Sequence, residues 1–254
     1  MKVCLICGRP RLLDAFSGEG GAGKGYMSAG FCVTAVDNSA ARLTRYPLDC
    51  PGAEAILGDA IEVILTRGHE FAVGHGSPTC TGYSRGTAAI PDRFERYDRL
   101  IPAVRDAFET AGIPYVIENV EDAKAELRSP LMICWTHLNQ PGSVVEADGT
   151  RLWMKRHRLF ESNVDLWPAG ECDHPKRFAL SGLQCAGAYG GARRDKVEAR
   201  NIRKGGYVPS VDVMRELLGT PWMSEKGCQL SIPPSYTEHI GRQLLAALET
   251  EAAA

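Results

Sequence analysis

The sequence has 254 residues, of which 44% are hydrophobic and 24% are charged, and its formal net charge is −2. This composition excludes a disordered, fibrous or membrane-spanning chain, because no stretch approaches the roughly 18 apolar residues that a membrane span needs. The small negative charge also excludes a uniformly basic nucleic-acid-binding protein, although a local basic patch remains compatible with it.

The nine cysteines are an odd number and, apart from Cys4-x-x-Cys7, they stand singly along the chain. The apolar stretch after Lys2 is too short and too soon interrupted for a signal peptide, so we expect a cytoplasmic protein with free thiols. Cys4 and Cys7 could bind zinc together with Cys172 and His174, but this spacing is a weak zinc pattern. Ordinary thiols are the competing interpretation, and the prediction is that there is no metal site.

Strand-like and helix-like stretches alternate over the first 120 residues. Apolar runs typical of strands and stretches typical of helices occur, in chain order, at 12–16, 24–29, 31–36, 39–46, 71–76, 98–111 and 114–117. Strands that alternate with helices predict an α/β fold with a doubly wound, mostly parallel sheet and helices on both faces.

The pattern loosens beyond residue 130. Residues 131–160 resemble strands joined by turns, and residues 165–210 resemble an irregular insert that is rich in glycine, proline and charge. Helix signals return at 209–218 and 236–248. We predict three parts: a catalytic α/β domain at 1–160, a small recognition insert at 161–210 and a C-terminal helical segment at 211–254.

A glycine-rich turn follows the first strand, with the pattern Phe16-x-Gly18-x-Gly20-Gly21. Glycines allow the backbone to approach a ligand closely, and the carboxyl ends of strands are where open α/β sheets bind cofactors. Asp37 ends the second strand, which is the usual position of an acid that binds a ribose. The alternative interpretation is a tight turn and a helix-capping acid.

Two further strand ends carry reactive side chains. Cys80 follows the strand at 71–76, and Glu118 ends the strand at 114–117. A thiol can become a nucleophile beside a cation, and a carboxyl group in an apolar cleft can stay protonated and donate a proton. Each residue alone is more often structural, but strand ends of a parallel sheet converge in space, so we expect them to share one site.

Five segments, in this order, resemble the motif series of the DNA cytosine-C5 methyltransferases: Asp14–Gly21, Ser77–Cys80, Glu118–Val120, Arg156–Phe160 and Pro233–Gly241. The resemblance extends from about residue 11 to 160 and again from 230 to 246. The short distance between the arginine motif and the C-terminal helix is similar to versions encoded by actinobacterial phages and prophages. The resemblance implies a sheet of the S-adenosylmethionine-dependent, Rossmann-like methyltransferase type.

The resemblance also implies roles for individual residues. Cys80 matches the nucleophile that adds to C6 of cytosine, and Glu118 matches the acid that engages N3 and the exocyclic amine. Arg156 and Arg158 match the arginines that hold the base and the adjacent phosphate, and Asn119 would order the loop around Cys80. The positions that match the S-adenosylmethionine site are Phe16, Gly18, Gly20, Gly21, Asp37, Asp59, Ala60, Pro78, Tyr236 and Thr237.

The chemistry of cytosine agrees with this assignment. C5 is a poor nucleophile until a thiolate adds to C6 and N3 is protonated, after which C5 can accept a methyl group. Because the base must leave the duplex to reach the thiol, we expect DNA with a flipped cytosine as the partner of a monomeric enzyme.

The sequence departs from the family pattern beside the nucleophile. Thr79 and Thr81 replace a proline and a glutamine, Met154 replaces a glutamine, and Ser84 keeps the family's hydroxyl group, which would face the DNA. These changes leave two other enzymatic interpretations open: C5 modification of a pyrimidine nucleotide, or transfer of a group other than methyl. A catalytically weak relative that binds DNA is the third alternative.

A basic segment lies where this family places target recognition. We expect its side chains to contact DNA phosphates, which contribute affinity but no sequence information, whereas the competing interpretation is a solvated loop. The residues expected to bind DNA there are Arg193, Arg194, Lys196 and Arg203.

Overall fold

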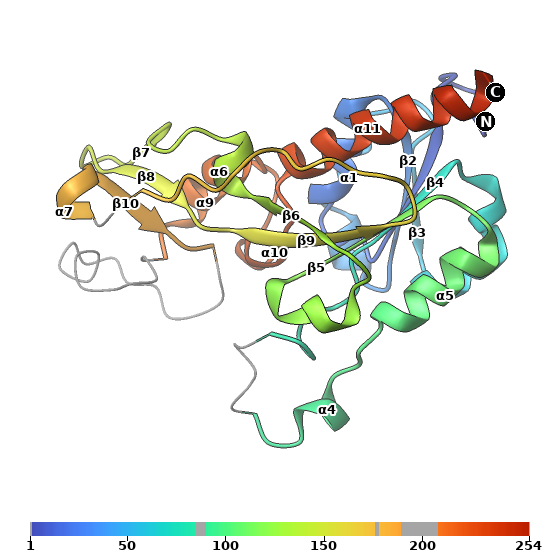
Figure 1. Ribbon diagram of the computed structural model, residues 1–254, viewed down its shortest axis with the longest axis horizontal. Coiled ribbons are helices and arrows are strands. Elements are labelled where there is room, and N and C mark those ends of the chain that lie inside the picture. The colour runs from blue at the N-terminus through green and yellow to red at the C-terminus, as the bar shows by residue number, and fades with distance from the viewer. Residues whose placement is uncertain (1, 85–89, 176–177, 189–207, 254) are drawn as a thin grey trace.

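A mostly parallel sheet forms the centre of the molecule (Figure 1). The computed structural model describes residues 2–84, 90–175, 178–188 and 208–253. Within these residues, seven strands join in the order β3-β2-β1-β4-β5-β9-β6. Their bounds are β1 Arg11–Ala15, β2 Cys32–Asp37, β3 Glu54–Leu57, β4 Val73–Gly76, β5 Tyr115–Asn119, β6 Leu131–Cys134 and β9 His157–Ser162.

The strands β1 to β5 run parallel to one another, whereas β9 runs antiparallel to both β5 and β6. Neighbouring residues of β1 point to opposite faces, so Leu12 is buried in one hydrophobic core and Leu13 in the other. A strand that is covered on both faces is apolar on both, which explains its continuous apolar sequence. The doubly wound α/β sheet predicted from the sequence is therefore confirmed.

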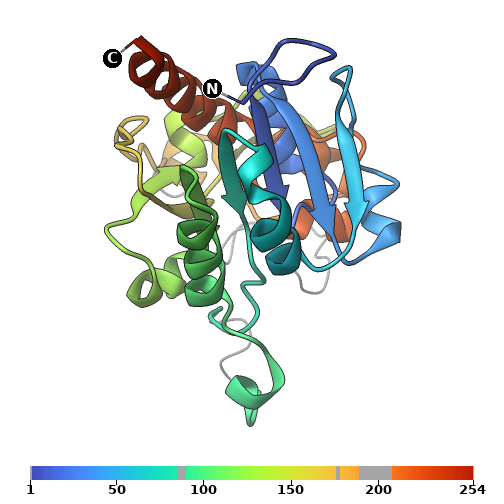
Figure 2. The ribbon, with the colours of Figure 1, turned by 90° about the vertical axis from the view of Figure 1, so that its right-hand side faces the viewer.

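Helices cover both faces of this sheet (Figures 1 and 2). α1 and α11 pack together on one face, where Tyr26 and Tyr236 are buried, and α3 and α5 cover the other, where Ile64 and Phe108 are buried. No helix in the described part of the chain is long and apolar enough to cross a membrane.

The helix bounds are α1 Gly21–Ala29, α2 Ala40–Leu43, α3 Ala60–Arg67, η1 Gly68–Glu70, α4 Arg93–Arg96, α5 Ile101–Ala111, η3 Glu121–Glu126, α6 Trp135–Leu138, α7 Phe178–Ser181, α9 Val211–Leu218, α10 Glu225–Leu230 and α11 Pro234–Ala253.

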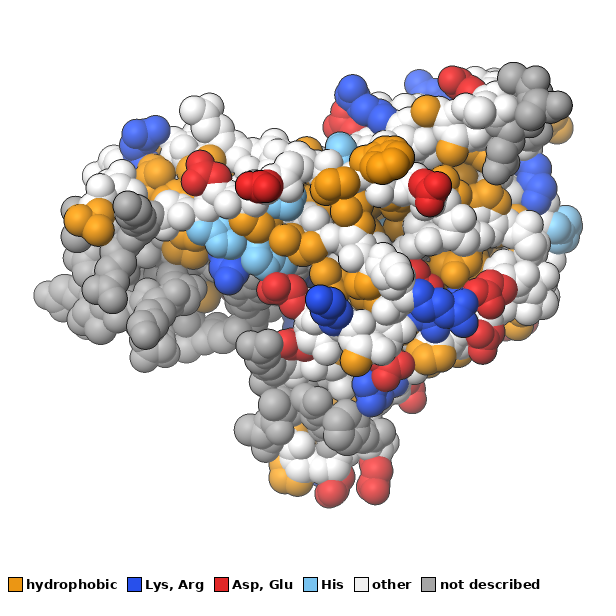
Figure 3. Space-filling view, in the orientation of Figure 1, with side chains coloured by type: hydrophobic (Ala, Val, Ile, Leu, Met, Phe, Trp, Pro, Cys, Tyr) orange, Lys and Arg blue, Asp and Glu red, His pale blue; other side chains and the backbone are white. Residues whose placement is uncertain are grey.

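A second, small sheet lies beside the antiparallel edge of the first. It consists of β7 (Val144–Val145), β8 (Arg151–Met154) and β10 (Leu183–Ala186), and β10 pairs with β8 in parallel. The small sheet thus joins segments from both sides of the boundary that we predicted at residue 160. Figure 3 shows histidine side chains gathered on the surface between this small sheet and the large one.

Most of the expected strands and helices are confirmed. The helices predicted at 24–29, 98–111, 209–218 and 236–248 correspond to α1, α5, α9 and α11. Strands predicted at 12–16, 31–36, 71–76 and 114–117 are confirmed as β1, β2, β4 and β5. The helix predicted at 39–46 is shorter in the structure, where α2 begins at Ala40 and ends at Leu43. Pro47 accounts for part of the difference, since a residue that precedes proline is disfavoured in helical conformation.

The edge strand β3 and the short helices α6 and α10 were not predicted. β3 alternates between half-buried and exposed residues over only four positions, which is too short a pattern to identify a strand. α6 occupies four residues in a segment that we expected to be strand, and it ends at Leu138. Its Trp135 side chain is buried and donates to the carbonyl oxygen of Leu217, a contact 82 residues away in sequence.

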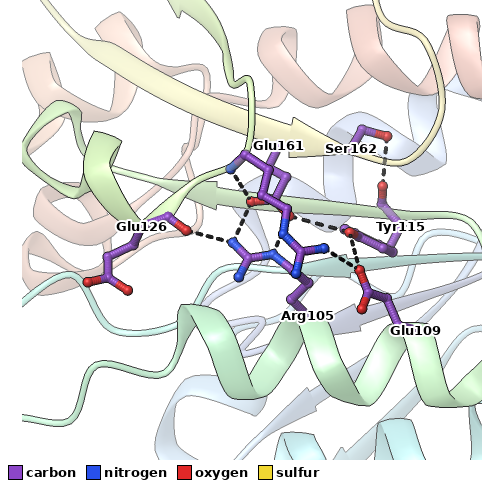
Figure 4. A network of polar contacts seen from close by, with 7 residues as sticks. Arg105, Glu109, Tyr115, Glu126, Glu161 and Ser162 are labelled. Atoms are coloured by element: carbon purple, nitrogen blue, oxygen red, sulfur yellow. Dashed lines mark hydrogen bonds and ion pairs between the residues drawn. The ribbon is translucent and has the colours of Figure 1, made fainter.

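A buried ion pair fixes the antiparallel strand β9 against helix α5 (Figure 4). Arg105 Nε lies 2.6 Å from Glu161 Oε1, and both side chains are almost fully buried. Tyr115 Oη and the backbone amide of Arg128 also donate to the Glu161 carboxylate. These bonds hold β9, which carries Arg158, in register with β5.

Candidate active site

A cavity of about 430 Å³ opens where β1, β2, β4 and β5 end. The strand order changes direction between β1 and β4, and this switch point is where open α/β sheets bind their ligands. The cavity also lies within the range of about 300–1,000 Å³ that is typical of small-molecule sites. Ten of the sequence-predicted site residues line it: Phe16, Gly18, Gly21, Asp37, Asp59, Ala60, Pro78, Cys80, Glu118 and Arg158.

The turn after β1 forms one wall of this cavity. Gly18 adopts a positive φ of 58° and has no neighbouring atom where a Cβ would stand, so its open side is free for a ligand. Gly21 has the opposite environment, because a Cβ there would collide with the carbonyl oxygen of Ile232. Gly20 lies outside the cavity lining and forms the N-cap of α1.

Two predicted acids stand beside this turn. The carboxylate of Asp37 accepts hydrogen bonds from the backbone amides of Gly18 and Ser39, both at 2.9 Å. Asp59 caps helix α3 by accepting from the amide of Glu62 at 2.9 Å. Asp59 is therefore a helix-capping acid, although the sequence analysis raised that alternative only for Asp37. Both residues line the cavity.

Three buried polar atoms on the cavity lining have no hydrogen-bond partner among the described residues: Asp14 Oδ1, Ser17 Oγ and Ser231 Oγ. The other oxygen of Asp14 accepts from Tyr46 Oη at 2.8 Å. Burial, reinforced by the nearby charge of Asp37, raises the pKa of Asp14 to about 7. Buried polar atoms are costly to leave unpaired, so these three are suited to a polar ligand.

Cys80 lies in a tight turn after β4. Its carbonyl oxygen accepts from the backbone amides of Tyr83 and Ser84, and its side chain is partly exposed to the cavity. Asn119 Nδ2 donates to the carbonyl oxygen of Pro78 at 3.0 Å, which connects the end of β5 to this turn. Burial raises the pKa of the Cys80 thiol, the Arg158 charge opposes that rise, and the Glu118 charge adds to it.

The two threonines on either side of Cys80 bond to each other. Thr79 Oγ1 lies 3.1 Å from Thr81 Oγ1, and the amide of Thr81 donates to Thr79 Oγ1 at 3.4 Å. This local pair, together with the Asn119 bond to Pro78, links the residues on both sides of Cys80.

Glu118 and Arg158 form a buried ion pair across the β5–β9 ladder. Arg158 Nε lies 2.9 Å from Glu118 Oε1, and each side chain is 8% exposed. Burial raises the pKa of Glu118, while the charges of Arg158 and Arg156 and a hydrogen bond from Ser77 lower it. A carboxyl group with a raised pKa can hold a proton and donate it to a ring nitrogen.

A hydrogen-bonded chain that the sequence did not reveal runs from the core to Glu118. His75 Nδ1 lies 3.0 Å from Tyr26 Oη, and His75 Nε2 lies 2.7 Å from Ser77 Oγ, which in turn bonds Glu118. Complete burial lowers the pKa of His75 to about 3, so the ring is neutral and bonds through one donor and one acceptor. The sequence analysis named no partner for His75.

Arg156, Tyr236 and Thr237 do not line the cavity, although we predicted them as site residues. The fully buried guanidinium of Arg156 donates to three backbone carbonyl oxygens, those of Ala188, Gln229 and Ser231. Tyr236 Oη donates to the carbonyl oxygen of Arg156 at 2.6 Å, and Thr237 Oγ1 donates to that of Ala22 at 2.8 Å. These side chains therefore connect the segments that line the cavity, without lining the cavity themselves.

A second wall of the cavity comes from the segment around α10, which the sequence analysis missed. Glu19, in the glycine turn, accepts from the amide of Ser224, and its carbonyl oxygen accepts from Trp222 Nε1 at 2.7 Å. Ser224 is the N-cap of α10, which is the one local signal that could have located the helix. The lining residues contributed here are Met223, Lys226, Gly227, Leu230, Ser231 and Ile232.

Five residues were predicted to bind DNA. Ser84 lies at the end of the Cys80 turn and does not line the cavity. The other four, Arg193, Arg194, Lys196 and Arg203, lie outside the described residues.

The strand order, the antiparallel strand beside β5 and the cavity at the strand ends define the Rossmann-like fold of the methyltransferases. The sequence matches no protein-family model and no curated protein.

Solved structures with the same fold are similar over nearly the whole chain. A putative DNA modification methyltransferase encoded within an Escherichia coli prophage has a TM-score of 0.58 and 14% identity, covering 94% of this chain and 99% of that one. The S. pombe Dnmt2 methyltransferase has a TM-score of 0.57 and 13% identity, with the same coverage. A mutant of DNMT2 from Spodoptera frugiperda has a TM-score of 0.53 and 14% identity, covering 93% and 99%. At these identities the likeness establishes the fold.

Proposed function

We propose that this protein transfers a methyl group from S-adenosylmethionine to C5 of cytosine in DNA, through a covalent bond between Cys80 and C6 of the base. One observation carries the proposal: the thiol of Cys80, the carboxyl group of Glu118 and the glycine turn after β1 line the same cavity. A nucleophile, a proton donor and a cofactor cradle are the groups that this reaction requires. The fold shared with methyltransferases supports the same conclusion.

The cavity residues fit S-adenosylmethionine. Its amino, carboxylate and hydroxyl groups would satisfy the unpartnered polar atoms of Asp14, Ser17 and Ser231. Asp37 would accept from the ribose hydroxyls, and Asp59 from the adenine amine, as the resemblance implies. When bound, this cofactor supplies a methyl group attached to a sulfonium.

The side chains of the chain itself would activate the base. After the Cys80 thiol loses its proton to solvent, its sulfur forms a bond to C6, and the electrons of the C5–C6 double bond become available at C5 while Glu118 protonates N3. C5 then forms a bond to the methyl group as the bond between that methyl group and the sulfonium breaks, which would leave a neutral thioether. The C5 proton leaves to solvent, the sulfur–C6 bond breaks, and N3 returns its proton to Glu118, so that the aromatic ring, the acid and the thiolate are restored. The positive charge of Arg158, 2.9 Å from Glu118, orients the acid and favours the thiolate.

DNA binding would require the target base to leave the stack, at a cost of a few kcal/mol. The contacts expected from Ser84 and from Arg193, Arg194, Lys196 and Arg203 remain predictions of this proposal. Phosphate contacts of this kind contribute affinity that weakens as the salt concentration rises.

A covalent trap tests the proposal. The protein is incubated with S-adenosylmethionine and duplex DNA containing 5-fluorocytosine, which blocks the loss of the C5 substituent and preserves the sulfur–C6 bond. We expect a denaturation-stable adduct, and peptide mapping should find it on Cys80. An adduct on free nucleotide but not on DNA would instead indicate a nucleotide substrate, and a shifted DNA band without any adduct would indicate a binding protein.

Two matched cysteine variants make the trap specific. Cys80→Ser should abolish the adduct. Cys228→Ser changes a buried cysteine of α10 that does not line the cavity, and it should keep the adduct. An adduct that persists in Cys80→Ser would overturn the proposed mechanism.

A further inference from the structure

Four metal-binding side chains converge outside the cavity, at the antiparallel edge of the large sheet: Cys134, His157, Cys172 and His174. Their ligand atoms all lie within 4.8 Å of one another. Cys134 ends β6 and pairs directly with His157 at the start of β9. Cys172 and His174 lie in the irregular segment that follows β9. Histidine side chains are visible on this surface in Figure 3.

The distances within this cluster match a tetrahedral zinc site. His174 Nε2 lies 3.3 Å from Cys134 Sγ and 3.3 Å from His157 Nε2, and Cys172 Sγ lies 3.5 Å from His157 Nε2. Tetrahedral zinc with bonds of about 2.0–2.3 Å places its ligand atoms roughly 3.3–3.8 Å apart. Two thiols and two imidazoles also form one of the commonest structural zinc ligand sets.

The surroundings of these ligands are those of a metal site. His157 Nδ1, the ring nitrogen that faces away from the cluster, lies 2.9 Å from Glu121 Oε1. The hydroxyl of Thr136 donates to Cys134 Sγ at 3.4 Å. Carboxylates that bond the second nitrogen of a ligating histidine orient the ring and increase its affinity for the metal.

We propose that this chain binds a structural zinc ion through Cys134, His157, Cys172 and His174. Four protein ligands fill the tetrahedral coordination and leave no open position for a substrate, so the site is structural. The ion would bind the irregular segment after β9 to the β6–β9 edge of the large sheet. In the sequence, this segment precedes α7 and strand β10 of the small sheet. The zinc ion would thereby set the position of the small sheet.

A separate cysteine cluster at the amino end of β2 independently supports a second zinc ion. The sulfurs of Cys4, Cys7 and Cys32 lie within 4.8 Å of one another, and Cys50 Sγ lies 3.5 Å from Cys7 Sγ. The backbone amides of Ile6 and Cys7 donate to the Cys4 sulfur. We infer a structural site formed by the thiolates of Cys4, Cys7 and Cys32 at the amino end of β2. Cys50, which lies beside Cys7 but outside this group of three, would complete the coordination by moving toward it.

The two clusters also correct an expectation from the sequence. Cys4 and Cys7 were considered as zinc ligands together with Cys172 and His174. The structure places these pairs in different clusters, so they cannot share one metal ion.

Metal analysis of the purified full-length protein tests both sites. We expect two zinc ions per chain after dialysis against a weak chelator. Cys134→Ser and Cys7→Ser should each lower the zinc content to one per chain. Cys185→Ser changes a cysteine of β10 that belongs to neither cluster, and it should keep both ions. Two ions in Cys134→Ser would overturn the first site, and two ions in Cys7→Ser would overturn the second.

X-ray absorption at the zinc edge of the wild-type protein decides the question even where a variant does not fold. Both sites together predict an average of three sulfur and one nitrogen neighbours per zinc ion. Two sulfurs and two nitrogens would leave only the Cys/His site, and four sulfurs would leave only the cysteine site. Protein that takes up no zinc after reconstitution with zinc chloride, or that contains a disulfide between these cysteines instead, would overturn both.

Discussion

The guanidinium of Arg158 lies 2.9 Å from the carboxylate of Glu118, and both side chains are buried at the bottom of the cavity that Cys80 also lines. Burial raises the pKa of Glu118 above its usual value, although the charges of Arg158 and Arg156 oppose the rise. A raised pKa favours the protonated carboxyl group, which can donate a proton to a base.

Glu118→Gln should separate the proton-donating role of this side chain from its hydrogen bonding. Glutamine can still bond a base and Arg158, but it cannot transfer a proton to N3. We expect the single-turnover rate of DNA methylation to fall by about 10²–10⁴-fold. A rate within about threefold of wild type would remove Glu118 from the proposed proton transfer.

Cys80→Ala should abolish turnover and leave cofactor binding intact. The Gly18 turn and Asp37 line the part of the cavity proposed to bind the cofactor, and the hydrogen bonds described for them do not involve the Cys80 side chain. Titration calorimetry with S-adenosylmethionine should therefore give an affinity close to wild type. Loss of cofactor binding together with turnover would mean that the substitution disrupts the cavity rather than the chemistry.

Stability should decrease as the pH rises, because of Asp14. Burial raises the pKa of this carboxyl group to about 7 in the folded protein, whereas an aspartate in an unfolded chain titrates near 4. The folded state therefore binds more protons between about pH 4 and 7, and the contribution of Asp14 to the free energy of unfolding falls by a few kcal/mol across that window.

Asp14→Asn isolates this contribution. Asparagine keeps an acceptor for Tyr46 and has no charge to bury, so urea unfolding of the variant should lose less stability from pH 5 to pH 8 than wild type does. Parallel pH profiles for the two proteins would show that Asp14 is ionised in the folded state at all of these pH values.

In the Arg105–Glu161 pair, each buried charge is compensated by the other, so we expect the pair to contribute to the free energy of unfolding only while both partners are present. Removing one partner leaves the other buried and unpaired, so Arg105→Met or Glu161→Gln should cost about 3–5 kcal/mol in the free energy of unfolding. The double variant Arg105→Met/Glu161→Gln should lose less than the sum of the two single variants. Strictly additive losses would show that the pair is not coupled.

The sequence predicted the strand ends well, because an apolar run followed by a polar residue such as Asp37 or Glu118, or by the turn that carries Cys80, can be recognised from local pattern alone. Parallel strands then bring those ends together without any knowledge of side-chain packing.

Residues that act across long sequence distances could not be predicted in this way. The sequence analysis placed Arg156 and Arg158 in one site, but β9 begins only at His157 and Arg156 does not line the cavity. Arg156 instead bonds carbonyl groups up to 75 residues away. The cluster around Cys134 was missed for the same reason, because its ligands come from three separate segments of the chain.

The most direct test of the central claim is quantification of 5-methylcytosine in DNA from a bacterial host that expresses this chain and lacks its own cytosine methyltransferases. The account predicts 5-methylcytosine with the wild-type chain and none above background with Cys80→Ala at equal expression. Equal 5-methylcytosine with both chains, or unmodified cytosine with the folded wild-type chain, would contradict it.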